Sequence, residues 1–244
     1  MRSTLPALIV ALAWCSPSAV SAAVSPELTD LAARIDYGFY TEDARAIEAA
    51  LAVLERSRDD PDAAYYHDFA VLRLAQLAPE ARAGRELVSD CAGHDVPVFA
   101  VKGRAAAEPW ILVAACAAVA DSGRRMEQAL ARARELDDDN PRIALVEAWA
   151  LQRELADDPA LHDTVVEKWR ATVAGFDAWS APPDAPQWGY AEALAALGEL
   201  TLHRGEVRLA RDLIERALLL APDYRFAMAL RSRMQGSGAA SRTP

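Results

Sequence analysis

Hydrophobic side chains recur every three or four residues along most of this chain, which is the spacing of one face of an α-helix. Val207, Ala210, Ile214 and Ala217 are an example from the last third. Two-residue alternation with β-branched enrichment, the pattern of a half-buried strand, is not found. We therefore predict an all-α protein, with helices near 26–40, 43–57, 61–78, 80–93, 106–121, 124–137, 141–156, 160–177, 187–203, 206–220 and 222–234.

Prolines mark the expected helix starts. Proline fits the first turn of a helix because its missing N–H would have no intrahelical partner there. A preceding Ser, Asp or Asn can accept hydrogen bonds from the free amides of that turn. This arrangement occurs at Ser25-Pro26, Asp60-Pro61, Asn140-Pro141 and Asp158-Pro159. We expect the same role for Pro79, Pro109 and Pro222.

The prolines also recur at long range. Pro61 and Pro141 are 80 residues apart, and Pro141 and Pro222 are 81 apart. Each interval holds two predicted helix pairs, one with a longer connection, near 94–105 or near 178–187. A fixed long period of helix pairs predicts a solenoid, in which each pair packs on the next. Chance coincidence of a few prolines is the alternative explanation.

The clearest repeat unit covers the last two helices before residue 222. With Ala191 as position 1 of a 34-residue unit, small or apolar residues occupy the positions where two helices must pack. They are Leu194, Leu197, Gly198, Thr201, Ala210, Ile214, Ala217 and Pro222. This pattern resembles the tetratricopeptide repeat (TPR). The same template fits more loosely from Trp110, and a degenerate third unit begins near Ile143.

The resemblance implies a right-handed α-solenoid of antiparallel, TPR-like helix pairs that ends in a C-terminal capping helix. The predicted organisation is degenerate helix pairs over 23–105, TPR-like repeats and cap helix over 106–234, and a disordered tail over 235–244. The run Gln187-Trp188-Gly189-Tyr190 is also similar to exported bacterial TPR-like proteins. Trp179 and Trp188 are expected to pack between helices, like the other tryptophans of the repeats. The alternative is that they form an exposed binding lip, because they flank a proline-rich connection.

The resemblance also implies a binding groove, because the first helix of each TPR pair lines the concave face. Carried onto this chain, the groove positions with polar or large side chains are Asp121, Glu147, Leu151, Glu192, Glu199 and His203. We predict a groove that mixes apolar and acidic groups and binds an extended protein or peptide segment with basic or uncharged residues. Ordinary solvated carboxylates on an acidic surface are the alternative.

The first 22 residues predict an export signal. Arg2 precedes a short apolar run, and Val20-Ser21-Ala22 supplies the small residues of a cleavage site. The expected location is therefore periplasmic or secreted. Trp14 before Cys15 is too bulky for a lipoprotein signal. An oxidising compartment permits a disulfide between Cys91 and Cys116, and two separately buried thiols are the alternative.

The net charge of −10 disfavours binding to nucleic acid, because phosphate backbones repel an acidic surface. Motifs for nucleophilic, metal or phosphate chemistry are not found. Asp137-Asp138-Asp139-Asn140 lacks the spacing of a Ca²⁺ loop and fits a helix-capping turn. We predict a non-catalytic interaction module of the cell envelope, without cofactor, metal or stable membrane insertion. The alternatives are a small-molecule-binding or transport accessory protein and an enzyme with an unrecognised site.

Overall fold

The computed structural model describes residues 25–78, 80–93, 106–181 and 185–240, and all regular elements in these ranges are helical. The fold class predicted from the periodicity is confirmed. In chain order the α-helices and 3₁₀ turns (η) are α1 Pro26–Tyr40, α2 Ala44–Leu54, η1 Glu55–Ser57, α3 Pro61–Leu77, α4 Ala81–Leu87, α5 Ser89–Gly93, α6 Glu108–Val119, α7 Gly123–Leu136, α8 Pro141–Glu154, η3 Pro159–Leu161, α9 His162–Ala178, α10 Tyr190–His203, α11 Val207–Leu220 and α12 Arg225–Ala240.

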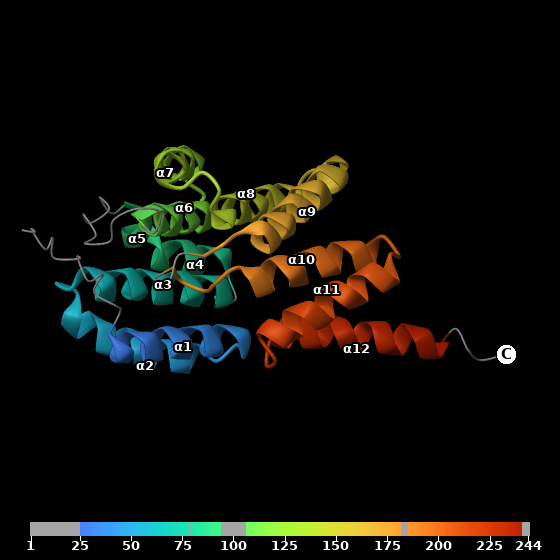
Figure 1. Cartoon of the computed structure of the whole chain (residues 1–244), viewed down its shortest axis with the longest axis horizontal. Coiled ribbons are helices and arrows are strands. Elements are labelled where there is room, and N and C mark those ends of the chain that lie inside the picture. The colour runs from blue at the N-terminus through green and yellow to red at the C-terminus, as the bar shows by residue number, and fades with distance from the viewer. Residues whose placement is uncertain (1–24, 79, 94–105, 182–184, 241–244) are drawn as a thin grey trace, which may run out of the picture.

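Neighbouring helices pack in pairs, and the pairs form an arch (Figure 1). The chain rises from α1 and α2 through α3–α5 to α6–α9, and descends through α10 and α11 to α12. The first and last helices meet at the base. The Tyr40 and Tyr224 rings lie 4.9 Å apart there, and Arg225 lies 3.8 Å from Glu42. This helical array therefore closes on itself.

The proline-marked helix starts are largely confirmed. The side chains of Ser25, Asp60 and Asn140 each accept a backbone hydrogen bond in the first turn of α1, α3 and α8. Asp158 does the same, but it caps η3 rather than an α-helix. Pro222 is the exception, because α12 begins later, at Arg225. Pro79 lies outside the described residues.

Some predicted boundaries are wrong. The helix expected over 80–93 is broken at Val88 into α4 and α5. The helix expected from 187 begins at Tyr190, because Gly189 has a left-handed φ of 103° that a helix cannot include. The last helix continues to Ala240, past the start of the tail expected at 235. Residues 241–244 lie outside the described residues.

The repeat register at the C-terminal pair is confirmed by its contacts. A Cβ atom on Gly198 would lie 2.9 Å from Ile214 Cγ1 and 3.6 Å from the Ala210 carbonyl oxygen. Leu194, Ala210 and Ile214 are fully buried. Gly198 therefore lies where α10 and α11 nearly touch, as the repeat pattern predicts.

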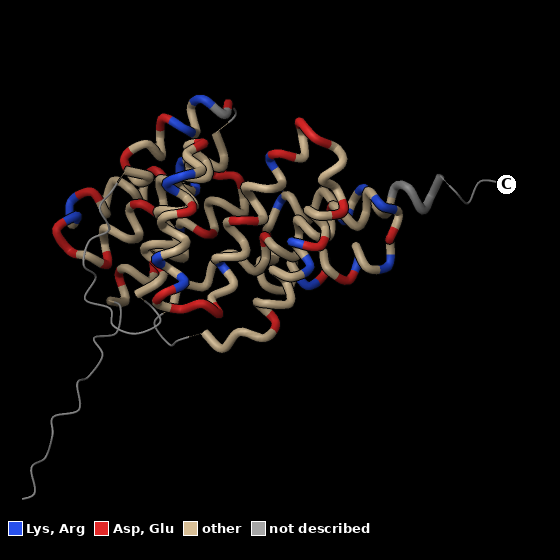
Figure 2. Tube along the Cα trace, turned by 90° about the horizontal axis from the view of Figure 1, so that it is seen from above, with Lys and Arg blue, Asp and Glu red and all other residues tan. Residues whose placement is uncertain are grey.

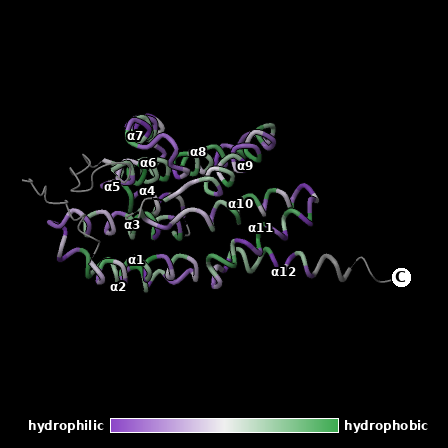
Figure 3. Tube along the Cα trace, viewed as in Figure 1, coloured by the Kyte–Doolittle hydropathy of each residue, from purple (hydrophilic) through white to green (hydrophobic). Residues whose placement is uncertain are grey.

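Helix α6 lies at the centre of the upper part of the arch and is apolar on all sides. Ile111, Ala114, Ala115 and Cys116 are completely buried, since α3, α5, α7 and α8 all pack on this helix. Figure 3 shows hydrophobic and hydrophilic stretches alternating along the other helices, as expected where one face meets solvent.

Cys91 of α5 and Cys116 of α6 form a disulfide in the structure, with Cα atoms 5.9 Å apart. The bond joins a five-residue helix to the most buried helix of the fold. It therefore anchors α5, which is too short to be stable on its own.

No helix of the described residues is both long and apolar enough to cross a membrane. The predicted signal segment 1–22 and the connection 94–105 lie outside the described residues.

Candidate functional site

A cavity of about 480 Å³ lies on the inner face of the arch. Its lining comes mainly from the first helices of the pairs (α1, α3, α8 and α10), together with α9, Tyr224 and the start of α12. Five aromatic side chains form much of this lining. They are Phe39, Trp149, Trp169, Tyr224 and Phe226. We call this space the inner cavity.

The polar lining of the inner cavity comes from three helices. It consists of Gln76, Gln152, Arg153, Glu192 and Glu199. Trp169 is itself completely buried, and its indole Nε1 has no hydrogen-bond acceptor among the described residues. The cavity therefore combines flat apolar rings with a few polar groups, which is the usual composition of a binding site.

Glu192 and Arg73 form a buried ion pair across the arch. The Arg73 guanidinium donates a hydrogen bond to one Glu192 oxygen, and the Tyr40 hydroxyl and the Gly189 N–H donate to the other, each at 3.0 Å. Arg73 is completely buried and Glu192 nearly so. Because α1, α3 and α10 all contribute, this network holds the two sides of the arch together.

Aromatic rings surround the Arg73 guanidinium. Its central carbon lies 4.0 Å from the Phe39 ring centre, 4.8 Å from that of Phe69 and 5.6 Å from that of Trp188. Cation–π attraction offsets part of the cost of burying the charge. Arg73 is thus held as a structural cation and is not available to a ligand.

The connection between α9 and α10 enters the interior of the arch. Trp188 is buried, stacks on Trp149 with ring centres 6.1 Å apart, and donates its indole N–H to the Tyr65 hydroxyl at 3.0 Å. Trp188 therefore packs in the core, as expected for the tryptophans, and does not form an exposed binding lip with Trp179. Its packing against distant helices could not be deduced from its place beside prolines.

A second buried arginine fixes this connection. Arg142 of α8 donates to the carbonyl oxygens of Trp188, at 2.9 Å, and Pro186, and to Glu108 Oε1 at 3.1 Å. Asn140 donates to the same Glu108 oxygen at 2.8 Å. Burial raises the pKa of the Glu108 carboxyl, and the adjacent Arg142 opposes that rise.

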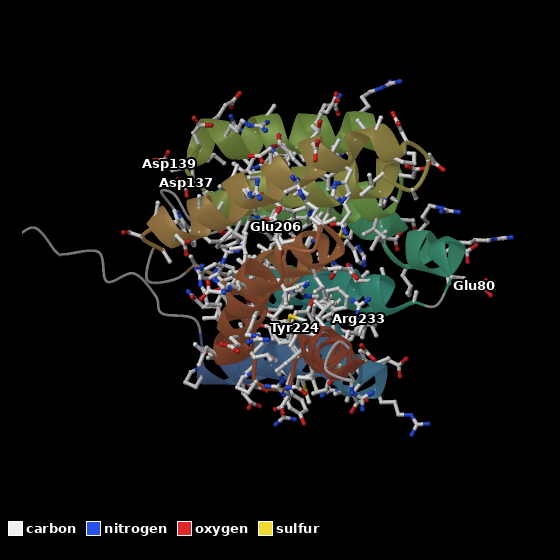
Figure 4. All side chains as sticks on the ribbon, turned by 90° about the vertical axis from the view of Figure 1, so that its right-hand side faces the viewer. Glu80, Asp137, Asp139, Glu206, Tyr224 and Arg233 are labelled. Atoms are coloured by element: carbon white, nitrogen blue, oxygen red, sulfur yellow. A yellow bond between two sulfur atoms is a disulfide. The ribbon has the colours of Figure 1, made fainter. Side chains whose placement is uncertain are left out.

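Two of the predicted groove residues reach the inner cavity, with different environments. Glu199 is partly exposed, and Arg233 lies 3.2 Å from its carboxylate in an exposed pair. Glu192 borders the cavity but is buried and neutralised by Arg73. Only Glu199 presents a carboxylate that a partner can reach. Figure 4 views this side of the molecule and labels Tyr224 and Arg233.

The other predicted groove residues lie elsewhere. Glu147 pairs with Arg134 and Lys168, on the side of α8 that faces α7 and α9. Leu151 is half-buried against the core, and His203 is exposed at the end of α10. Asp121 has a left-handed φ of 60° in the turn after α6 and pairs with Arg153 at 2.8 Å. The structure therefore does not gather the six residues into one groove.

Glu147 and Leu151 do not line the inner cavity, because α8 turns inward a different face from the one that the assigned repeat register predicts. The cavity-lining residues of this helix are Trp149, Gln152 and Arg153, which share one face at spacings of three and four. Glu147 precedes Trp149 by two positions and so projects to the opposite side. At the position of Gly198 in α10 the degenerate unit has Ala150, which marks a close helix crossing less clearly than glycine does.

A second cavity, of about 550 Å³, lies beside the α9–α10 connection. Its rings come from Tyr40, Phe176, Trp179, Trp188 and Tyr190, and its charged side chains are Asp36 and Arg142. We call this space the linker cavity. The Tyr40–Glu192–Arg73 network lies between it and the inner cavity.

Within the described residues, no group of His, Cys, Asp and Glu is arranged to hold a metal ion. Acidic and basic positions are spread over the whole trace in Figure 2, without a continuous basic stripe.

Comparison with known proteins gives little further guidance. No protein-family model matches the chain, and no curated protein matches it. Among solved structures it is similar to YrrB, described as a TPR protein with an unusual peptide-binding site. That likeness has 12% sequence identity, covers 84% of this chain and 97% of that chain, and has a TM-score of 0.36. The helix-pair architecture described here rests on the contacts within this chain.

Proposed function

We propose that this protein is a non-catalytic interaction module that acts outside the cytoplasm and binds a protein or peptide segment in the inner cavity. The observation that carries the proposal is the convergence of five aromatic rings and one reachable carboxylate, Glu199, on the inner face of the helix pairs. The export signal expected over 1–22 supports the location.

The chemistry of the inner cavity favours a segment with a basic side chain beside apolar ones. The positive charge of a Lys or Arg side chain is attracted to the ring faces of Tyr224 and Phe226 and to the Glu199 carboxylate. Arg233 pairs with Glu199 on the surface, so an incoming cation can displace it at small cost. The protein's net charge of −10 also favours basic partners.

The test is selection of short random peptides on the immobilised protein, followed by affinity measurement with the enriched peptides. We expect enrichment of Lys or Arg next to apolar residues. Glu199→Lys and Phe226→Ala should each weaken binding by about tenfold or more, since removing a central contact costs over about 1 kcal/mol.

The matched control is Glu215→Lys, which makes the same charge change at an exposed position of α11. It should leave the affinity unchanged. Enrichment of acidic peptides would contradict the proposal, as would selection that is indifferent to both inner-cavity variants.

A further inference from the structure

The linker cavity is bordered by a carboxyl group, that of Asp36, with one oxygen that accepts no hydrogen bond from the part of the chain that the structure describes. Arg142 is matched by Glu108, and Arg73 by Glu192, each through a direct hydrogen bond. Asp36 is a third carboxyl group beside these two pairs. Its Oδ1 is buried, lies 3.8 Å from the Arg73 guanidinium, and accepts no hydrogen bond among the described residues. This oxygen lies on the Arg73 side of the carboxyl group, so the remaining, partly exposed part of the Asp36 side chain borders the cavity.

Asp36 is accessible through the cavity. Its side chain is 28% exposed, so the group is enclosed by protein on most sides yet open to the space that it lines. Above a pH of about 7, where Asp36 is ionised, three carboxylates (Asp36, Glu108 and Glu192) lie beside two arginines among the described residues, which leaves one excess negative charge. A single positive charge placed in the cavity would balance it.

The other residues that line the linker cavity indicate the size and chemical character of the rest of the ligand. Phe176 and Tyr190 stack with ring centres 5.2 Å apart, and Trp179 and Trp188 add two indole rings. The Trp179 Nε1 atom is buried without an acceptor among the described residues. A volume of about 550 Å³ suits a small organic molecule.

From this arrangement we propose that the linker cavity binds a small organic monocation, an amine with an aromatic or aliphatic body. The ammonium group binds the Asp36 carboxylate and contacts the Tyr40 ring. The body lies among the rings of Phe176, Trp179 and Tyr190. This site is separate from the inner cavity and does not depend on peptide binding there.

Three small molecules of similar shape but different charge test whether the ligand must be a cation. They are tyramine, which is a cation, tyrosol, which is neutral, and 3-(4-hydroxyphenyl)propionate, which is an anion. Titration calorimetry with the full chain should show tyramine binding at least about tenfold more tightly than tyrosol, and no binding of the anion.

Asp36→Asn should abolish the preference for tyramine over tyrosol while leaving the weak affinity for tyrosol unchanged. The matched control is Asp30→Asn on the same helix, where Asp30 is exposed and pairs with exposed Arg34. Trp179→Ala removes one of the rings that line the cavity, and should weaken the binding of both tyramine and tyrosol. This second variant keeps the test valid if Asp36→Asn fails to fold.

The proposal is overturned if tyramine binds no better than tyrosol, or if Asp36→Asn retains the full preference. It also fails if Glu199→Gln, rather than Asp36→Asn, removes tyramine binding, because the cation would then be bound in the inner cavity. In that case the proposed peptide site would still stand.

Discussion

Gly198 shows how much one residue of this sequence specifies about its surroundings. The repeat spacing predicts a close helix crossing at this position, and a Cβ atom there would lie only 2.9 Å from Ile214 Cγ1. Such a contact leaves no room for a side chain unless the helices separate.

We expect Gly198→Leu to lower the free energy of unfolding by about 1–3 kcal/mol through overpacking. Gly123→Leu is the control, because a Cβ atom at Gly123 would meet no atom within 4 Å. It should change stability by about 0.5 kcal/mol or less. Urea denaturation measures both, and equal stability of the two variants would contradict the assigned crossing.

The buried charges are the residues that sequence reasoning missed. Arg73 and Asp36 each stand in an amphipathic helix where a charge ordinarily marks the solvent side. The partner of Arg73 is Glu192, 119 positions away, and nothing local in the sequence indicates that the two helices meet. A charge is recognised as buried only when the tertiary contacts are known.

Asp36 gives the fold a dependence on pH. Burial raises its pKa from 3.8 to about 7, and the Arg73 charge opposes that rise. Asp36 is influenced by Arg73 of α3, Glu192 of α10 and Arg142 of α8, as well as by Tyr40 of its own helix. The folded state therefore keeps a proton that the unfolded state loses. The contribution of Asp36 to stability is highest below pH 3.8 and declines as the pH rises to about 7.

Asp36→Asn should remove this decline. We expect the variant to gain about 1–3 kcal/mol over the wild type at about pH 8, with the difference shrinking towards about pH 4. Denaturation at a series of pH values measures the gain. Asp30→Asn serves as the exposed control, and a constant difference between Asp36→Asn and wild type at every pH would refute the assignment.

At the scale of elements, periodicity and proline positions predicted most helices, but not how short segments are held. The break between α4 and α5 follows from tertiary packing at Val88, which is completely buried. The α9–α10 connection was predicted as irregular from its prolines. Its entry into the interior depends on Arg142, whose hydrogen bonds to backbone carbonyl groups no pattern reveals.

The Cys91–Cys116 bond should matter most for α5. Closing a chain segment with a sequence separation of 25 contributes roughly 3 kcal/mol in the chain-entropy model. We expect the double variant Cys91→Ser, Cys116→Ser to lose about that amount and to exchange the amide hydrogens of α5 faster than those of α10. Exchange followed by mass spectrometry makes the comparison. Unchanged protection of α5 would show that packing alone holds it.

At the scale of the whole molecule, the arch is held where its two ends meet. The solenoid architecture was predicted from the helix-pair period, whereas the contact between α1 and α12 was not. Closure brings α1, α3 and α10 together around Arg73 and Glu192, and the inner cavity lies on the inner face of these helices. Glu192, expected to line a concave groove, is almost completely buried instead.

A double-mutant cycle measures the strength of this closure. Arg73→Met or Glu192→Met alone should cost about 3–5 kcal/mol, because each leaves a buried charge without its partner. The double variant should cost less than the sum of the single variants. Purely additive losses would mean that the two charges do not stabilise each other across the arch.

The meeting of α1 with α12 also constrains how this protein can change over evolution. An open array accepts the gain or loss of a unit, because each unit needs only its neighbours. Here an added helix pair would move Tyr224 away from Tyr40, and α1 and α12 would lose their contact with each other. The number of units is therefore fixed by a geometric condition, and descendants of this protein should vary in the surface loops rather than in length along the array.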